Sequence, residues 1–409
     1  MTMETYYDVL IIGGGMVGAS LAHALLGIGL RVGVVEAHAP NTDQQPSYDD
    51  RVIALAWGSR LILEGMGVWP DIAPAAEPIR HIHISERGHF GFARFDAKEE
   101  RVEALGYVVT ARDLGRALLA ELESAGQVDL FCPARLDSFT PEAERVRVTV
   151  REGDEIRRLE TRLLVAADGG DSVVRRLLGI PVQERRYGQT AIISNITPER
   201  PHAGIAYERF TDSGPLAMLP MTEGRCSLVW TARDEQVDEI MSWDDTRFLA
   251  QLQDRFGYRL GRLLKTGRRA AYPLKLMRVR EQVRRRVVLI GNAAHAVHPV
   301  SGQGFNLGIR DVAVLADLLA EAARMRSDPG AMALLERYAE WRAGDQRMVA
   351  TITDTLARLF ANPLPPLRLA RDCGLLGLDL CPPVKHLTAR QFMGLNGRLP
   401  RLARGLPVV

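Results

Sequence analysis

Three glycines near the start of the chain, Gly13, Gly15 and Gly18, have a spacing that suits a phosphate-binding turn. They follow an apolar run, Val9–Ile12, that has the length of a buried strand, and apolar residues at helical spacing come after them. Gly13 permits a tight turn, Gly15 lets the backbone approach a pyrophosphate, and Gly18 lets the helix pack close to the strand. The N-terminus of that helix offers N–H groups and a positive dipole to phosphate.

An acidic residue, Glu36, ends the second apolar run, Arg31–Val35. It lies about 20 residues beyond the glycines, where a carboxylate can accept hydrogen bonds from a ribose. Strand, glycines, helix, strand and acid therefore come in the order of a dinucleotide site. This pattern alone does not distinguish NAD from FAD.

A second strand-and-turn pattern covers residues 163–176 and contains Asp168 and Gly169 at the end of the predicted strand. A helix start with Asp171 and Ser172 follows. Two interpretations remain open, because an aspartate here can cap the helix or can contact a cofactor.

A third pattern, over residues 286–311, holds a strand, a Gly-Asn-Ala-Ala-His turn and a His-Pro pair. Gly302, Gly304 and Gly308 then lead into a long helix. Such a helix start stabilises the negative charge that a reduced flavin carries at N1 and the C2 oxygen. We therefore predict that the backbone of Phe305 and Asn306 lies against the flavin ring, with Pro299 beside it, although an ordinary glycine-rich helix start is the simpler interpretation.

Taken together, the three patterns resemble those of the aromatic-ring flavoprotein monooxygenases. Within that class the chain is similar to the hydroxylases of ubiquinone biosynthesis over nearly its whole length. The blocks that carry this closer resemblance are residues 50–55, 81–89, 207–221, 224–230 and 301–308. One position departs from the class, because Gly291 is followed by Asn292 where an aspartate is usual. An asparagine still accepts and donates hydrogen bonds, so FAD binding is expected to survive without the carboxylate charge.

The resemblance implies an α/β fold with a glutathione-reductase-like FAD-binding domain, an interleaved and mostly antiparallel substrate-domain sheet, and a helical C-terminus. The expected division is 1–75, 104–180 and 272–340 for the FAD-binding domain, 76–103 and 181–271 for the substrate-binding domain, and 341–409 for the helical region. Residues expected to bind FAD are Gly13, Gly15, Gly18, Glu36, Arg51, Arg112, Asp168, Asn292, Gly302 and Gly304.

The implied reaction is hydroxylation of the ring of a polyprenylated phenol by a C4a-hydroperoxyflavin, with FAD as cofactor and NAD(P)H and O2 as co-substrates. Apolar alternation predicts strands at residues 204–210, 216–221 and 225–231. We expect these strands to line the ring pocket with Tyr207, Leu219, Pro220 and Trp230. Two alternatives are an FAD-dependent prenyl reductase, which would not consume O2, and a non-catalytic flavin-binding subunit of a biosynthetic complex.

The composition excludes other classes of function. The formal net charge is only +2, which gives no general attraction to nucleic acid. The four cysteines are irregularly spaced and the histidines have no acidic or cysteine cluster beside them, so neither disulfides nor a metal site is expected. The N-terminus has no leader pattern and no window is apolar enough to span a membrane, which predicts a cytoplasmic protein.

The chain beyond Asp379 contains five basic residues and no acidic one, with leucines between them. One interpretation is a packed C-terminal helix with a basic solvent face. The other is a surface that contacts anionic lipid, through which the enzyme would reach a membrane-bound substrate. The resemblance also raises membership in a ubiquinone-biosynthesis complex.

Overall fold

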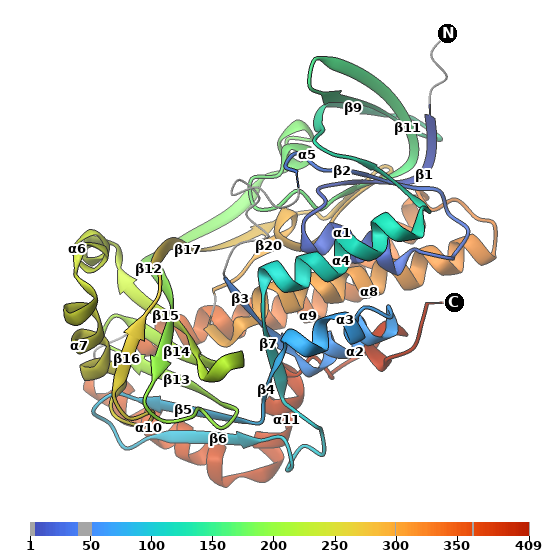
Figure 1. Ribbon diagram of the computed structural model, residues 1–409. Helices are drawn as coiled ribbons and strands as arrows, with labels where there is room; N and C mark the ends of the chain where they lie inside the picture. The colour runs from blue at the N-terminus through green and yellow to red at the C-terminus, as the bar shows by residue number, and fades with distance from the viewer. Residues whose placement is uncertain (1–4, 40–50, 299, 362–363, 409) are drawn as a thin grey trace.

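A computed structural model describes residues 5–39, 51–298, 300–361 and 364–408. The chain forms three sheets with helices packed around them (Figure 1). The strand and helix content and the interleaving of the sheets confirm the predicted α/β fold class.

The first sheet has a parallel centre, in the order β18-β19-β11-β1-β2-β8. Its strands are β1 (Thr5–Ile12), β2 (Val32–Val35), β8 (Val128–Phe131), β11 (Glu155–Ala166), β18 (Val283–Arg284) and β19 (Val287–Leu289), with β9 (Arg135–Pro141) and β10 (Val146–Glu152) as an antiparallel extension of β11. The predicted strands before Gly13 and Glu36 are β1 and β2, which pair in parallel. Their loops therefore meet at the same edge of the sheet, where ligands of such folds bind.

The second sheet has nine strands, in the order β20-β17-β12-β15-β14-β13-β5-β6, with β16 beside β12. It is antiparallel except where β13 pairs with β5. The strands are β5 (His81–Glu86), β6 (Phe92–Asp96), β12 (Val182–Pro198), β13 (Ile205–Thr211), β14 (Gly214–Pro220), β15 (Cys226–Arg233), β16 (Leu263–Thr266), β17 (Ala270–Val279) and β20 (His295–Ala296). The strands predicted from apolar alternation are β13, β14 and β15.

A small sheet of β3 (Val52–Ala56), β7 (Gly106–Thr110) and β4 (Glu77–Ile79) lies between the two larger sheets (Figure 1). The other helices before residue 300 are α1 (Met16–Ala24), α2 (Trp57–Gly65), α3 (Trp69–Ile72), α4 (Ala111–Ala125), α5 (Val173–Leu177), α6 (Val237–Ser242) and α7 (Asp245–Phe256). Helices α1 and α4 cover the parallel sheet together with α8 (Gln303–Arg324), whereas α6 and α7 cover the outer face of the nine-stranded sheet. The division into three domains remains our proposal; β17 and β20 belong to the nine-stranded sheet although their residues fall largely in the predicted FAD-binding segment.

Three helices follow α8: α9 (Met332–Ala361), α10 (Pro365–Leu380) and α11 (Pro382–Phe392). Figure 1 shows α8 and α9 running alongside one another and α10 beneath the strands β5 and β6. Helix α10 is attached to that edge by a buried ion pair in which Arg371 binds both carboxylate oxygens of Glu86. In addition, Asp372 accepts a hydrogen bond from the backbone of Gly91 at 3.0 Å.

The C-terminal segment is also attached to the body of the protein. Lys385 is buried against Glu99 at 2.8 Å, and the guanidinium of Arg398 lies 3.9 Å from the centre of the Trp341 ring. Leu402 is completely buried in the main core. At least two of the five basic residues beyond Asp379 therefore have structural contacts.

Candidate functional site

The glycine turn after β1 has the shape that the sequence predicts. Gly13 has a φ of +102°, and a Cβ atom there would lie 2.5 Å from the carbonyl oxygen of Ala167. A Cβ atom on Gly18 would lie 1.9 Å from the carbonyl oxygen of Gly13. Gly15 is the N-cap residue of α1. No side chain larger than hydrogen fits at Gly13 or Gly18. The backbones of β1, the turn and α1 are therefore in close contact.

Glu36 is held directly beside this turn. Its carboxylate accepts hydrogen bonds from the backbone N–H of Gly14 at 2.7 Å and of His38 at 2.8 Å, one at each oxygen. Each carboxylate oxygen can accept more than one hydrogen bond. Glu36 is therefore fixed in orientation and still able to accept hydrogen bonds from ribose hydroxyls.

Asp168 caps the helix α5, as one of the two interpretations predicts. One carboxylate oxygen, Oδ2, accepts hydrogen bonds from Val173 N at 2.7 Å and Val174 N at 3.2 Å. The other oxygen, Oδ1, is buried without a hydrogen-bond partner among the described residues, and burial raises the pKa of the group. A buried acceptor without a partner is unfavourable, so this atom fits a ligand hydroxyl. The cap therefore leaves room for the cofactor interpretation as well.

Arg175 joins the Asp168 turn to the Gly291–Ala293 turn. Its guanidinium donates to Ala293 O at 2.9 Å and to Gly170 O at 2.6 Å. The side chain of Asn292 lies between these turns and the solvent, and it is exposed. The second and third sequence patterns, more than 100 residues apart, thus form one surface.

Asp311 binds the backbone of the Gly291 turn, and no spacing pattern in the sequence singles this residue out. Its carboxylate accepts from Gly291 N at 3.0 Å and Arg342 Nε at 2.7 Å, and it lies 2.6 Å from His295 Nε2. A fourth hydrogen bond comes from Gln346 at 2.9 Å. Burial opposes ionisation of this group, but His295 and Arg342 outweigh it and hold the pKa of Asp311 far below its usual range.

Asn306 connects the start of α8 to β3. Its side-chain oxygen accepts from Ala56 N at 2.8 Å and Ser59 Oγ at 2.7 Å, and its amide donates to Ala54 O at 2.8 Å and Gly302 O at 2.7 Å. The side chain therefore has a positioning role, and the predicted contact with a flavin concerns the backbone of Phe305 and Asn306. Pro299 lies outside the described residues.

The Gly302 turn is strained enough to require glycine. Gly302 is the N-cap residue of α8 and has a φ of +60°, whereas a Cβ atom on Gly304 would meet no atom within 4 Å. The first-turn N–H groups of a helix have no partner within the helix. The start of α8 therefore offers donors next to open space.

The backbones of Arg51 and Arg112 lie close together where β3 meets the start of α4. The carbonyl of Arg51 accepts a hydrogen bond at 2.7 Å from the N–H of Ala111, the neighbour of Arg112. The guanidinium of Arg51 lies 5.0 Å from the centre of the Tyr272 ring. An arginine can bind a phosphate or a carbonyl oxygen, and the role of these two arginines toward FAD stays a prediction.

The predicted ring-pocket residues do not share one face of the nine-stranded sheet. Tyr207 and Trp230 pack into the outer core against α7, and Trp230 is only 1% exposed. Leu219 packs on the opposite face with Val52 of β3 and Val108 of β7. Pro220 pairs with Cys226, which belongs to the outer core. The prediction is therefore wrong for Tyr207 and Trp230, which face away from the glycine turns, because alternation reveals that two faces exist without revealing which one is inside.

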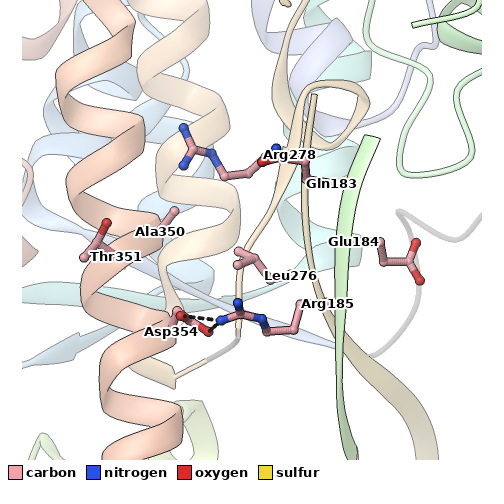
Figure 2. Close-up of a pocket in the computed structure, with 8 residues that line it drawn as sticks. All are labelled: Gln183, Glu184, Arg185, Leu276, Arg278, Ala350, Thr351 and Asp354. Carbon is pink, nitrogen blue, oxygen red and sulfur yellow. Dashed lines mark hydrogen bonds and ion pairs between the residues drawn. The ribbon is translucent and has the colours of Figure 1, made fainter. Parts of the chain in front are cut away.

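A separate polar pocket of about 440 Å³ lies between α9 and the strands β12 and β17 (Figure 2). Figure 2 shows Arg185 reaching toward Asp354, to which it donates at 3.0 and 3.2 Å, while Glu184 points away from α9. Asp354 also accepts from the hydroxyl of Tyr187 at 3.1 Å. The pocket has few apolar walls, so it does not suit a prenyl chain.

The described residues fit FAD at the edge of the parallel sheet. The glycine turn and α1 suit a pyrophosphate, Glu36 suits a ribose, Asp168 has an unpaired buried oxygen, and the start of α8 suits the ring. Among the residues that the structure describes, no group of histidines, cysteines and acids is arranged to hold a metal ion, and no disulfide joins the four cysteines.

This fold and this site define a flavin-dependent monooxygenase of the aromatic-ring class. Residues 6–351 match the family described as "FAD binding domain", and the chain belongs to that family. It is 40% identical over 404 residues to the ubiquinone hydroxylase UbiL of Rhodospirillum rubrum, covering 98% of this chain and 93% of that protein. It is 31% identical over 392 residues to the 3-demethoxyubiquinol 3-hydroxylase of Escherichia coli, covering 95% of this chain and 98% of that protein.

A solved structure with the same fold is the p-nitrophenol 4-monooxygenase PnpA of Pseudomonas putida. Its TM-score is 0.80 at 18% identity, covering 97% of this chain and 100% of that one. These comparisons confirm that the protein is an FAD-dependent aromatic monooxygenase, a class of enzyme that uses NAD(P)H as co-substrate. They do not favour the reductase or the non-catalytic subunit.

Proposed function

We propose that this enzyme hydroxylates the ring of a polyprenylated (methoxy)phenol in ubiquinone biosynthesis, using NAD(P)H and O2. The observation that carries the proposal is the 40% identity to a ubiquinone hydroxylase over 98% of the chain. The inner face of the nine-stranded sheet supports it, because that face is largely apolar around Ala206, Leu219 and Met221 and looks toward β3 and β7. An apolar surface beside the flavin loops suits a prenylated ring.

In this proposal FAD, when bound, takes electrons from NAD(P)H and activates O2. The chain supplies position and polarity. Glu36 would accept hydrogen bonds from the ribose, while Arg51, Arg112, Asp168 and Asn292 would contact the rest of the cofactor. The N–H groups at the start of α8 would stabilise the negative charge that the flavin gains on reduction.

Mass spectrometry of the quinone intermediates in a strain lacking this protein tests the proposal. The strain should accumulate a polyprenylated phenol that lacks one ring hydroxyl, and the gene should restore the final quinone. The Gly18→Ala gene, which disturbs the glycine turn, should restore it poorly. A strain with a normal intermediate profile would contradict the proposal.

We also propose that the enzyme reaches its substrate by peripheral contact with anionic lipid, through the outward side of α10 and α11. Its exposed apolar residues are Leu369, Leu380, Val384 and Leu387, with exposed fractions of 58%, 76%, 50% and 64%. Arg368 and Arg390 are exposed on the same two helices. Apolar side chains flanked by cations are typical of interfacial helices.

Among the residues that the structure describes, no helix is both long enough and apolar enough to span a bilayer. A contact with other enzymes of ubiquinone biosynthesis is a further part of this proposal.

Flotation with anionic liposomes tests the lipid contact. Replacing both Leu380 and Leu387 by Glu should abolish flotation without unfolding the protein, because both side chains are exposed. Leu264→Glu is the control, since Leu264 is 53% exposed on the distant strand β16. Binding of the unaltered protein should also weaken with salt, because surface charges are screened over about 8–10 Å. Undiminished flotation of the double variant would show that another surface or a partner protein delivers the substrate.

A further inference from the structure

One acidic residue lies in the middle of the inner face of the nine-stranded sheet. Glu208 of β13 is directly opposite Ile84 of β5 on one side and Ala217 of β14 on the other. Ala217 is in turn opposite Val229 of β15. Residues directly opposite one another point to the same face, so Glu208 is the one charged group in a cross-strand row of apolar side chains.

The neighbours of Glu208 on its own strand show what this face looks toward. Ala206 packs with Val52 of β3, the residue after Arg51. Phe210 packs with Val300, which lies in the short turn before α8. Glu208 stands between these two contacts, and thus opposite the gap between the Arg51 segment and the α8 turn. This is where the proposed function places the reacting ring.

The carboxylate of Glu208 is unsatisfied. It makes no hydrogen bond or ion pair with any residue that the structure describes, unlike Glu86 on the same sheet, which is bound by Arg371. Burial raises the pKa of Glu208 to about 7, yet its side chain is not completely enclosed. Together these observations describe a carboxylate deep in the protein beside a space that solvent can reach. An acid in such a setting is uncommon unless a ligand uses it.

Two hydroxyls lie close to this row. Ser227 and Thr231 flank Val229 on β15, so their side chains share its face. Both hydroxyls are buried without a hydrogen-bond partner among the described residues. The part of the inner face around Glu208 thus has three polar groups without partners among the described residues, next to the apolar side chains of the cross-strand row. This is the composition expected of a site for a ring with a few oxygen substituents.

We infer that Glu208 is the group that binds the phenolic hydroxyl of the substrate, accepting its hydrogen bond and thereby fixing which ring carbon faces the flavin. The inference rests on the proposed function, since it takes a phenol as substrate. Ala217, directly opposite Glu208, has a small side chain and is also partly exposed, which suits the edge of a ring. Ser227 and Thr231 are the residues suited to the remaining ring oxygens.

A comparison of two probes tests this inference. A phenol with a short prenyl chain and its O-methyl ether would each be titrated into the FAD-loaded enzyme and its variants, with Kd measured from the flavin absorbance. Glu208→Gln keeps the shape of the side chain and Glu208→Leu removes its polarity. Glu235→Gln is the matched control, because Glu235 is exposed in the turn before α6. FAD content and melting temperature show that each variant is folded.

The unaltered enzyme should bind the phenol on the order of tenfold to a hundredfold more tightly than the ether, because a hydrogen bond to a charged group is strong in a buried site. Glu208→Leu should bind both probes nearly equally, Glu208→Gln should retain part of the preference, and the control should match the unaltered enzyme. A folded Glu208→Leu variant with the full preference would overturn the assignment of Glu208 alone. An unaltered enzyme that binds neither probe would overturn the proposed function together with it.

Discussion

The side-chain oxygen of Asn306 accepts a hydrogen bond at 2.8 Å from the backbone N–H of Ala56, 250 positions earlier in the chain. This contact attaches the start of α8 to the small sheet between the two larger ones. Asn306 uses all its hydrogen-bonding capacity in this way, so the helix start and β3 are positioned as one unit.

Replacing Asn306 by Leu should therefore lower both stability and FAD affinity. Each buried group left without a partner costs about 1–3 kcal/mol. Asn306→Asp keeps the side-chain acceptor, so it should lose less stability and less FAD affinity than Asn306→Leu. The control is Asn396→Leu, which removes a single hydrogen bond to Gln391 and should have little effect on either quantity. Denaturant unfolding and FAD titration measure both quantities, and unchanged FAD affinity in folded Asn306→Leu would show that the unit does not position the cofactor.

The predicted contact between the start of α8 and the flavin can be tested through the flavin potential. Phe305→Pro removes one N–H in the first turn, where the helix itself does not use it. If that N–H stabilises the anionic reduced flavin, the midpoint potential should fall by about 30 mV or more. Spectroelectrochemical titration measures it, and a potential equal to that of the unaltered enzyme would count against the contact.

The close approach of α1 to the glycine turn can be tested by adding one methyl group at Gly18. Gly18→Ala should displace α1, because the added Cβ atom would lie 1.9 Å from a backbone oxygen, and should lower stability by about 1–3 kcal/mol and reduce bound FAD. Gly344→Ala is the control, since a Cβ atom there meets nothing within 4 Å in the helix α9. The ratio of flavin to protein absorbance reads out the difference, and a fully FAD-loaded Gly18→Ala protein would refute the close approach.

Asp311 should contribute strongly to stability, because it is completely buried and has four hydrogen-bond partners. Asp311→Asn removes the charge that balances His295 and Arg342, and breaking a buried ion pair costs about 3–5 kcal/mol. Asp71→Asn, at an exposed position in α3, should be nearly neutral. Denaturant unfolding at neutral pH measures the effect, and equal losses in the two variants would mean that the network contributes little.

The burial of His298 should make the stability of the protein depend on pH. Burial lowers its pKa to about 4, while an unfolded histidine has a pKa of about 6.5. Between these values the unfolded chain binds a proton that the folded chain does not. The contribution of His298 is therefore complete above about pH 6.5 and falls by about 3 kcal/mol as the pH drops to about 4.

His298→Asn keeps an acceptor for the N–H of Val300 and removes the titration. Its stability should change less between pH 6.5 and 4 than that of the unaltered protein. The comparison requires unfolding free energies at several pH values. Equal slopes for His298→Asn and the unaltered protein would contradict the burial of a neutral imidazole.

The sequence predicted those parts of the site that depend on local backbone geometry. Glycine spacing and apolar alternation are local properties of the sequence. They predicted the glycine turn, Glu36 directly after β2, and the strands β13, β14 and β15 of the nine-stranded sheet. Tyr207 and Trp230 were misplaced because both faces of β13 to β15 are apolar, and only the position of α7 shows which is the outer one. Asp311 was missed because its partners Arg342 and Gln346 lie 31 and 35 positions later on another helix. Glu208 was missed because a lone acid within a strand has no distinguishing spacing.

The proposed reaction inserts one atom of O2 into a phenolic ring. The most direct measurement is incubation of the FAD-loaded protein with a short-chain prenylated phenol and NAD(P)H under ¹⁸O2, followed by mass spectrometry of the product. We expect a hydroxylated ring that carries one ¹⁸O atom, and no label in the product when the water is labelled in place of O2. Consumption of NAD(P)H with a product that contains no ¹⁸O would contradict it.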